Sequence, residues 1–353
     1  MPPPGMLRRG ARRRVLAGLA VAAALVALVA ALLAWRRRRR LARETFDDDL
    51  AIFVSVASYR DPDCLDTLKS MFENAANAGR VVAGVCEQNT SAARELCLPA
   101  DFKWHDRVRR ISVPHKEARG PTYARYLCST LFRGEAYFCQ IDSHTRFVKD
   151  WDRKAVAMLR ACPSAKPVLT HYPHDWDQSA TGTTDVPVLC KSKFDPNGVP
   201  TFEAVTLRAS AKPRPVPFTS GGFVFGPGSM LAEVPYDPDL PQLFQGEEIL
   251  YSARLWTAGY DFYTPTENLV FHHYYRKSSP KYWDDIEFST QQKRTLDKVR
   301  ALLTGKLPAY RYGMGAARTL AQYWKYAGLD WATKKSTSQA KFCGPATVRR
   351  QTR

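Results

Sequence analysis

Three side chains that can bind a metal or move a proton follow a short apolar run near the middle of the chain. The segment 136–141 is mostly apolar or aromatic, and it ends at Asp142, Ser143 and His144. Side chains alternate in direction along an extended strand, so Asp142 and His144 can point the same way at its end. A carboxylate oxygen and an imidazole nitrogen in that arrangement favour a site for one divalent ion. The alternative is that these residues are only a polar end to a buried strand.

Two further groups of polar residues lie downstream and could complete such a site. Glu247 and Glu248 precede an expected helix, where acids either serve chemistry or simply complement the positive end of the helix dipole. His272 and His273 directly follow an expected strand over 266–271, and either one could supply a third ligand. Mixed oxygen and nitrogen ligands suit Mn²⁺ better than Mg²⁺, which prefers oxygen ligands alone. A histidine at the end of a strand is also common as a purely structural residue.

The elements that must position these side chains begin with an apolar strand over 50–57. A helix over 64–78 and a second strand over 80–86 follow it, and this order predicts a right-handed parallel unit. Ligands of open parallel sheets gather at the carboxyl ends of the strands. Residues 58–61 and 87–89 are polar and fall at those ends. The first part of the body is therefore expected to be an α/β nucleotide-binding half.

A second candidate anion site lies before an expected helix over 122–131. Arg119 and Gly120 precede this helix and Arg125 lies on it. A helix N-terminus beside two arginines suits a phosphate group, and the alternative is a solvated basic turn. The next expected strand is 136–141 itself.

The second part of the body has a different character. Residues 163–217 are rich in Pro, Thr, Asp and Lys, and short apolar runs within them are expected to be edge strands in irregular structure. The paired glycines Gly221 and Gly222 would let a ligand approach the backbone closely. A charged amphipathic helix over 284–303 is expected to close the fold.

The formal charge of +18 is concentrated at the two ends of the chain. Residues 1–43 hold eleven arginines and no acid, and residues 332–353 hold six basic residues and no acid. Residues 44–331 contain 35 basic and 34 acidic residues, so a basic nucleic-acid-binding domain is not expected. The eight cysteines show no CxxC pair and no zinc spacing with histidine. Cys86 and Cys139 fall in apolar runs and are expected to be buried thiols.

An uncharged run of mostly Ala, Leu and Val is long enough to span a bilayer as a helix. Five arginines follow it without a small-residue cleavage site, which favours an uncleaved anchor. Arginines flank both ends, so charge does not fix the orientation, and an Arg-rich organelle-targeting leader is the alternative. A short N-terminal tail before a large domain favours a single-pass type II protein of the Golgi or ER with a lumenal body. The expected divisions are a basic tail (1–14), the anchor (15–35), a short basic stem (36–49), a globular domain (50–331) and a basic, flexible tail (332–353).

Seven short motifs in one order carry a resemblance to a known family. They are VSVASYRD, CEQN, ARGPTYARY, QIDSHTRF, FTSGGFVFG, FQGEEILYSARLWTAGYDFY and FHHYYR, and together they cover roughly residues 50–280. The chain resembles the α-N-acetylglucosaminyltransferases whose best-known members modify hydroxyproline on a cytoplasmic ubiquitin-ligase subunit. It is more distantly similar to the polypeptide N-acetylgalactosaminyltransferases, which share a DxH in place of the usual DxD.

This resemblance implies a GT-A glycosyltransferase catalytic domain, with a Rossmann-like nucleotide half and an acceptor half. It implies a UDP-sugar donor, with GlcNAc as the sugar, a divalent metal, and transfer with retention to a hydroxyl on a protein or glycan. The metal ligands would be Asp142, His144 and His272, with His273 as the rival for the third position. The acids near the donor sugar and the acceptor would be Glu247 and Glu248.

The resemblance also assigns the donor-binding residues. The uridine pocket would be formed by Ser58, Tyr59, Arg60, Asp61 and Glu87, the diphosphate or sugar would face Arg119, Gly120 and Arg125, and the sugar would approach the backbone at Gly221 and Gly222. The expected anchor differs from the cytoplasmic family members, which favours a lumenal acceptor. Two other functions compete with this hypothesis: an inactive membrane-tethered protein that binds nucleotide sugars or carbohydrate, and a nucleic-acid binder that uses the arginine-rich ends.

Overall fold

The computed structural model describes residues 50–276, 279–287, 290–307 and 309–344. Within these ranges no helix is long and apolar enough to cross a bilayer. The expected tail, anchor and stem over 1–49 lie outside them, so these three remain sequence-based expectations.

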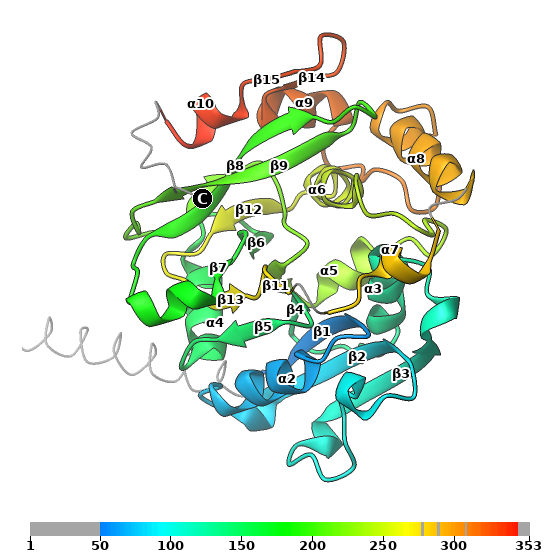
Figure 1. Ribbon diagram of the computed structural model, residues 1–353. Coiled ribbons are helices and arrows are strands. Elements are labelled where there is room, and N and C mark those ends of the chain that lie inside the picture. The colour runs from blue at the N-terminus through cyan, green and yellow to red at the C-terminus, as the bar shows by residue number, and fades with distance from the viewer. Residues whose placement is uncertain (1–49, 277–278, 288–289, 308, 345–353) are drawn as a thin grey trace, which may run out of the picture. The chain divides into compact units, whose positions relative to one another are not determined.

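Four parallel strands form the N-terminal half of an eight-stranded sheet (Figure 1). They are β1 (Ile52–Tyr59), β2 (Val81–Asn89), β3 (Val108–Pro114) and β4 (Tyr137–Asp142). β1 pairs in parallel with both β2 and β4, and β2 pairs in parallel with β3. This pairing confirms the expected parallel unit. Strands such as β1 are continuous apolar runs because parallel strands are covered on both faces. The polar residues after β1, β2 and β4 therefore meet at one edge of the sheet.

The other half of the sheet is mixed in direction. It adds β6 (Pro167–Thr170), β10 (Arg214–Val216), β11 (Phe223–Pro227) and β12 (Asp261–Thr264), giving the order β10-β12-β6-β11-β4-β1-β2-β3. β11 is antiparallel to β4 and β6, and β12 is parallel to β6. The expectation of an edge strand at 167–171 is wrong, because β6 has a neighbour on each side. Val168 and Leu169 are both fully buried, so opposite faces of this short strand are covered.

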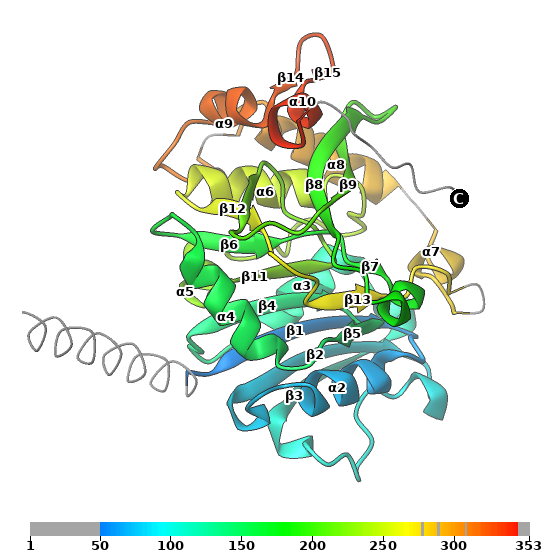
Figure 2. The same cartoon turned by 90° about the vertical axis from the view of Figure 1, so that its left-hand side faces the viewer.

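Helices cover both faces of the sheet (Figure 2). The helices of the body are α2 (Cys64–Glu73), α3 (Pro121–Ser129), α4 (Trp151–Ala161), α5 (Ser229–Glu233) and α6 (Glu247–Thr257). α2 and α4 share one apolar core with the Ile52 face of β1. α5 and α6 share a second core with the opposite, Phe53 face. This alternation of buried residues along β1 is what the side-chain geometry of a strand between two helical layers requires.

A second, three-stranded sheet lies over the carboxyl end of β4. It consists of β5 (Thr145–Phe147), β13 (Val270–His272) and β7 (His174–Asp175). β13 is antiparallel to β5, and His272 stands opposite Thr145 in their register. A residue 130 positions downstream is thereby placed beside the end of β4, which is the main contribution of the fold to the site.

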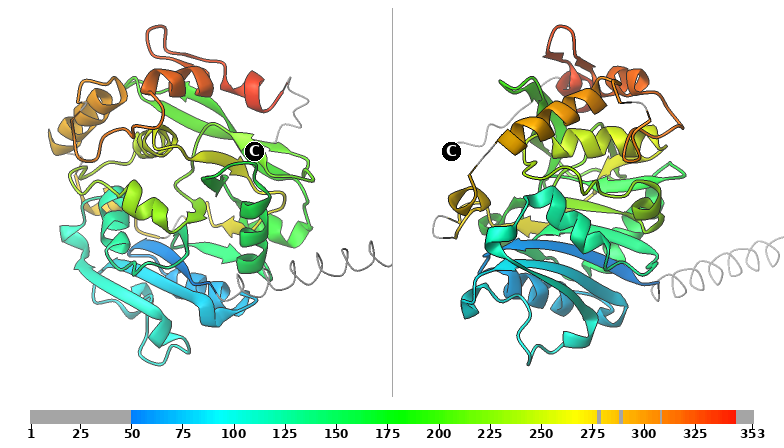
Figure 3. Two further views of the ribbon diagram at one scale, coloured as in Figure 1. Left: turned by 180° about the vertical axis from the view of Figure 1, so that it is seen from behind. Right: turned by 90° about the vertical axis from the view of Figure 1, so that its right-hand side faces the viewer.

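The C-terminal elements gather beside a hairpin of β8 (Val186–Phe194) and β9 (Pro200–Leu207), at the other end of the body from β3 (Figure 3). They are α8 (Thr290–Leu303), α9 (Leu320–Ala327), β14 (Leu329–Asp330), β15 (Lys335–Ser336) and α10 (Ser338–Phe342). The expected helix over 284–303 is two helices, since α7 (Tyr282–Asp285) is separate from α8. Residues 332–344 belong to this folded layer and differ from the expected flexible tail.

Two disulfides cross-link segments of the body. Cys190 of β8 pairs with Cys343 after α10, with their Cα atoms 6.0 Å apart, and this bond holds the C-terminal layer to the hairpin. Cys64 pairs with Cys97, with Cα atoms 4.9 Å apart. Cys86 and Cys139 are buried and form no disulfide, as expected from their apolar surroundings.

Candidate active site

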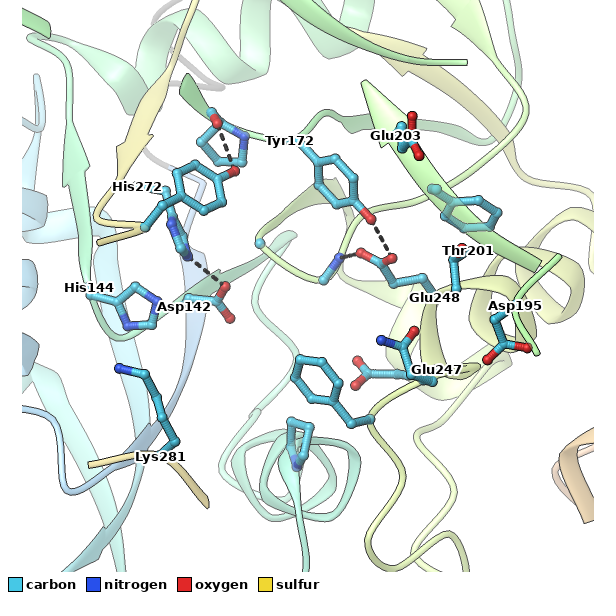
Figure 4. Close-up of a pocket in the computed structure, with 18 of the residues that line it drawn as sticks. Asp142, His144, Tyr172, Asp195, Thr201, Glu203, Glu247, Glu248, His272 and Lys281 are labelled. Carbon is cyan, nitrogen blue, oxygen red and sulfur yellow. Dashed lines mark hydrogen bonds and ion pairs between the residues drawn. The ribbon is translucent and has the colours of Figure 1, made fainter. Parts of the chain in front are cut away.

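Asp142, His144 and His272 converge where β4 ends (Figure 4). Their potential ligand atoms all lie within 4.8 Å of one another. Asp142 Oδ2 is 3.1 Å from His272 Nε2, and the His144 and His272 rings meet edge to face at 4.4 Å between centroids. One carboxylate oxygen and two imidazole nitrogens at these separations can share one divalent ion, so the residues present fit a metal centre. Asp142 and His144 meet as expected, but strand alternation is not the cause, since β4 ends at Asp142 and His144 lies in the bend before β5.

His273, the rival for the third ligand, points elsewhere. Its Nδ1 lies 2.8 Å from Asp63 Oδ2, and its ring stacks on Trp176 at 4.9 Å between centroids. Its backbone N–H donates to the His144 carbonyl at 3.0 Å. Of the two adjacent histidines, the structure therefore brings His272 into the cluster, because neighbouring residues on β13 face opposite ways.

Asp61 holds His144 in place through a hydrogen bond. Its buried carboxylate accepts hydrogen bonds from His144 Nδ1 at 2.7 Å and from Ser143 Oγ at 2.6 Å. Arg276 Nη1 donates to the same oxygen at 3.0 Å. A carboxylate that holds one ring nitrogen of a ligand histidine fixes the ring and leaves the other nitrogen for a metal. The observed contacts of the Asp61 carboxylate are with the cluster, and its expected role in a uridine pocket stays a prediction.

The electrostatics of the cluster favour the protonation states that a metal requires. Burial alone would raise the pKa of Asp142, but the hydrogen bond from His272 and the charge of Arg125 hold it below its usual range. Burial lowers the pKa of His144 and outweighs the opposing effect of the hydrogen bond that His144 donates to Asp61, so the neutral imidazole is favoured near neutral pH. An ionised carboxylate and a neutral imidazole are the forms that bind divalent ions.

The cluster opens into a pocket of about 900 Å³ that is also lined by residues of α3, α6 and the β8–β9 hairpin. Figure 4 shows Asp142, His144 and His272 on one side of this pocket and Thr201 and Glu203 of the β8–β9 hairpin on the other. Tyr172 and Glu248 lie between these two sides. Of the predicted site residues, the pocket is lined by Arg125, Asp142, His144, Gly221, Gly222, Glu247, Glu248 and His272.

Arg125 connects two of the predicted acids. Its guanidinium donates to Asp142 Oδ1 at 3.1 Å, to the Gly221 carbonyl at 3.0 Å, and to Glu247. Glu247 also accepts from Thr122 Oγ1 at 3.2 Å. Because Glu247 is fully engaged by groups of α3, its observed role is to hold Arg125 beside the cluster.

Glu248 forms no ion pair with any residue that the structure describes. It accepts a hydrogen bond from the Gly221 N–H at 2.7 Å and another from the Tyr172 hydroxyl. Burial raises the pKa of its carboxyl, and the two hydrogen bonds only partly oppose this effect. Gly222 packs its backbone against the cluster, because a Cβ atom at this position would lie 3.4 Å from Asp142 Oδ2.

Ser58, Tyr59 and Arg60, at the end of β1, do not line the pocket next to the cluster. The Tyr59 hydroxyl donates to Asp285 at 2.7 Å, and the Arg60 guanidinium bridges Asp285 at 2.7 Å and Glu95 at 3.1 Å. The buried Ser58 hydroxyl makes no hydrogen bond. Asp285 belongs to α7, so this network ties α7 to the end of β1.

Three other predicted residues make contacts of a structural kind, and their expected roles in donor binding stay predictions. Glu87 accepts the backbone N–H groups of residues 97 and 98 at 3.0 and 3.1 Å, and it lines a separate pocket formed by β2, β3 and the segment 90–96. Arg119 is exposed and stacks on Tyr123 at 5.0 Å, and Gly120 serves a positive φ of 89° before α3. The sequence could not separate these structural roles from phosphate binding, because both place basic and small residues before a helix.

Sequence reasoning missed several residues of the pocket. Arg276 and Lys281 add positive charge beside the cluster, while Lys193, Asp195 and Glu203 come from the hairpin. Arg276 ends the FHHYYR motif, so a signal for it was present. No signal was available for the hairpin residues, because they come from a stretch that looks irregular in sequence.

Solved structures similar in fold are glycosyltransferases. A crystal structure of GalNAc-T7 with UDP, GalNAc and Mn²⁺ matches with a TM-score of 0.50 and 14% identity over 82% of this chain and 55% of that chain. This chain therefore spans 55% of the length of GalNAc-T7, and the similarity shows the GT-A fold. Residues 1–349 of S. aureus TarS match with 11% identity over 79% of this chain, with UDP-GlcNAc (71% of that chain, TM-score 0.46) and without it (70%, 0.48).

The sequence itself gives the family. No curated protein sequence matches the chain. A family model described as glycosyltransferase (GlcNAc) matches residues 51–103 and 99–333, which is most of the chain and all of the site described above. With this match, a GT-A sheet and an Asp-His-His cluster where β4 ends, the chain belongs to the GlcNAc glycosyltransferase family.

Proposed function

We propose that the protein is a metal-dependent, retaining glycosyltransferase that moves GlcNAc from UDP-GlcNAc to a hydroxyl group on a protein or glycan. The observation that carries this proposal is the convergence of Asp142, His144 and His272 at the head of a pocket of about 900 Å³. A GT-A glycosyltransferase of similar fold, GalNAc-T7, was crystallised with UDP, GalNAc and Mn²⁺, which supports a UDP-sugar donor and a divalent ion.

In the proposed reaction the bond between sugar C1 and the β-phosphate oxygen breaks, and a bond between C1 and the acceptor oxygen forms. The acceptor proton passes to the leaving phosphate, so retention needs no separate protein base. A divalent ion held by Asp142, His144 and His272 would supply Lewis-acid stabilisation of the charge that develops on the diphosphate. The mixed ligand set favours Mn²⁺ over Mg²⁺.

The chain's own charged groups support the same reaction. Arg276 and Lys281 line the pocket next to the cluster, where their charges would hold the diphosphate. Arg125 donates hydrogen bonds to Asp142 and to the Gly221 carbonyl, and so holds in place the floor of the pocket, the surface on which the sugar would lie. Glu248 would accept hydrogen bonds from sugar hydroxyls on the far side of that floor.

We also propose a single-pass type II membrane protein with its catalytic body in the lumen of the Golgi or ER. The uncharged run at 15–35 supports an anchor. The two disulfides of the body support an oxidising compartment, since such bonds are rare in the cytosol.

A panel of UDP-sugars tests the proposed function. We expect hydrolysis without acceptor to be fastest for UDP-GlcNAc with Mn²⁺, slower with Mg²⁺ and abolished by EDTA. Binding of UDP-sugars without turnover of any of them would instead favour an inactive carbohydrate-binding protein.

A further inference from the structure

Three solvent-exposed aromatic side chains line the pocket. Six large hydrophobic residues are exposed within the described residues, and Phe244, Tyr274 and Trp283 among them line this one pocket. Scattered exposed hydrophobic residues need no explanation, but a group inside a concave site marks a surface that binds something. None of the three is one of the candidate metal ligands, although the Tyr274 ring packs against His272 with centroids 4.1 Å apart.

Two of the three form a pair that joins separate elements. Phe244 precedes α6 and is 48% exposed, while Trp283 lies on α7 and is 45% exposed. Their rings meet edge to face, with centroids 5.3 Å apart and planes at 76°. In this arrangement only one face of one ring is covered by the other ring, so aromatic faces remain open.

Polar side chains of the β8–β9 hairpin line the same pocket. Thr201 and Glu203 lie on the same side of β9, and Lys193 and Asp195 come from the end of β8 and the turn. Glu203 pairs through one oxygen with Lys193 at 2.6 Å and through the other with Lys191, and Asp195 accepts the Val199 N–H at 2.8 Å. A carboxylate oxygen can accept more than one hydrogen bond. This pocket wall therefore offers hydrogen-bond donors and acceptors as well as open aromatic faces.

We infer that this wall, defined by Phe244, Trp283, Lys193, Thr201 and Glu203, binds an oligosaccharide acceptor; this inference rests on the proposed function. A pyranose ring has an apolar C–H face and a rim of hydroxyl groups. Its C–H hydrogens carry partial positive charge and so suit the negative face of an aromatic ring. The hydroxyl rim suits the adjacent carboxylate, hydroxyl and ammonium groups.

The pocket extends well beyond the metal cluster. Its volume of about 900 Å³ lies near the upper end of the range of about 300–1,000 Å³ that is typical of ligand sites. In Figure 4, Glu248 and Tyr172 stand between the metal cluster and the hairpin side. An acceptor on the hairpin side would thus present its hydroxyl to the donor sugar across Glu248.

The test compares two classes of acceptor in one assay. Purified full-length protein is given UDP-GlcNAc and Mn²⁺, and the donor is also incubated alone to measure its hydrolysis. One set of acceptors is a panel of di- and trisaccharides of galactose, glucose, mannose and N-acetylglucosamine. The other is a pool of eleven-residue peptides with a central serine, threonine or hydroxyproline.

Variants then ask whether the wall binds the acceptor. We expect Trp283→Ala to raise the KM for the best saccharide at least tenfold while donor hydrolysis stays within twofold. Trp283→Phe should restore most of the affinity, because it keeps an aromatic face. Tyr275→Ala is the matched control, since Tyr275 is 76% exposed but does not line the pocket, and it should leave both rates unchanged.

Saturation-transfer NMR provides a reading that does not depend on turnover. With UDP bound, the ring C–H protons of the saccharide should receive the strongest saturation, and this signal should be lost in Trp283→Ala. Transfer to peptides but not to saccharides, or donor hydrolysis with no transfer to either class, would overturn the inference. Absence of donor hydrolysis would instead contradict the proposed function on which the inference depends.

Discussion

Replacing Asp61 with asparagine tests how the metal cluster is held together. One oxygen of this buried carboxylate accepts from His144 Nδ1 at 2.7 Å, Ser143 Oγ at 2.6 Å and Arg276 Nη1 at 3.0 Å. The other oxygen accepts the Asp63 N–H at 3.1 Å. Asparagine has the same shape, but its NH₂ group must face either the Asp63 N–H or the three donors. Asp61→Asn therefore leaves donors without an acceptor and removes the charge that fixes His144.

The size of the effect follows from the position of Asp61 behind a metal ligand. Removing such a supporting carboxylate typically lowers metal affinity or activity by about 10–100-fold. A tenfold change corresponds to about 1.4 kcal/mol, so we expect a loss of about 1.4–2.8 kcal/mol in Mn²⁺ binding. The maximal rate at saturating Mn²⁺ should fall less than the affinity, because the three ligands themselves remain.

Isothermal titration of Mn²⁺ in the presence of UDP measures this affinity directly, and circular dichroism checks that the variant is folded. Asp63→Asn is the matched control, because Asp63 lies two residues away and binds His273, which is outside the cluster. We expect Asp63→Asn to change Mn²⁺ affinity less than threefold. A folded Asp61→Asn protein with wild-type Mn²⁺ affinity would refute the role of Asp61, as would an equal effect of both substitutions.

Three other predictions concern the disulfide of the C-terminal layer, Gly222 beside the cluster and the buried carboxyl group of Glu248. Cys343→Ser should lower the free energy of unfolding by about 2–5 kcal/mol, since it opens the bond to Cys190; equal denaturant midpoints with and without this bond would contradict it. Gly222→Ala should raise the KM for UDP-GlcNAc about tenfold at an unchanged melting temperature, because its methyl group would enter the space next to Asp142; an unchanged KM would show that the sugar does not approach there. Burial raises the pKa of Glu248, so the folded state binds more protons than the unfolded chain above the ordinary value of 4.5, and this group lowers stability as pH rises through that window. Glu248→Gln should therefore become more stable relative to wild type from pH 4.5 to pH 8, and chemical denaturation that shows a constant difference between the two would contradict the shift.

The parallel half of the fold could be predicted because its signals are local. β1, β2 and β4 are apolar runs that end abruptly in polar residues, and the chain between them has a helical period. The same property made Asp142 and His144 recognisable, since one ends β4 and the other follows it by two residues. Ordered family motifs then linked them to His272, a residue that no local pattern could connect to them.

The rest of the site depends on contacts between distant segments. The choice of His272 over His273 was open in the sequence, because it is decided by the pairing of β13 with β5. Asp61 and Arg119 have residue types that suit a nucleotide site, yet one supports His144 and the other stacks on Tyr123. Lys193, Thr201 and Glu203 come from the β8–β9 hairpin, and the Pro-, Thr-, Asp- and Lys-rich composition of residues 163–217 suggested irregular structure there.

The most direct test of the account is Mn²⁺-dependent hydrolysis of UDP-GlcNAc by the wild type and by Asp142→Ala, with His273→Ala as the matched control. The cluster predicts that Asp142→Ala loses at least a hundredfold in hydrolysis at saturating donor, whereas His273→Ala keeps a rate within about threefold of the wild type. Equal hydrolysis by the wild type and a folded Asp142→Ala protein, or a rate that persists in EDTA, would contradict the proposed metal centre.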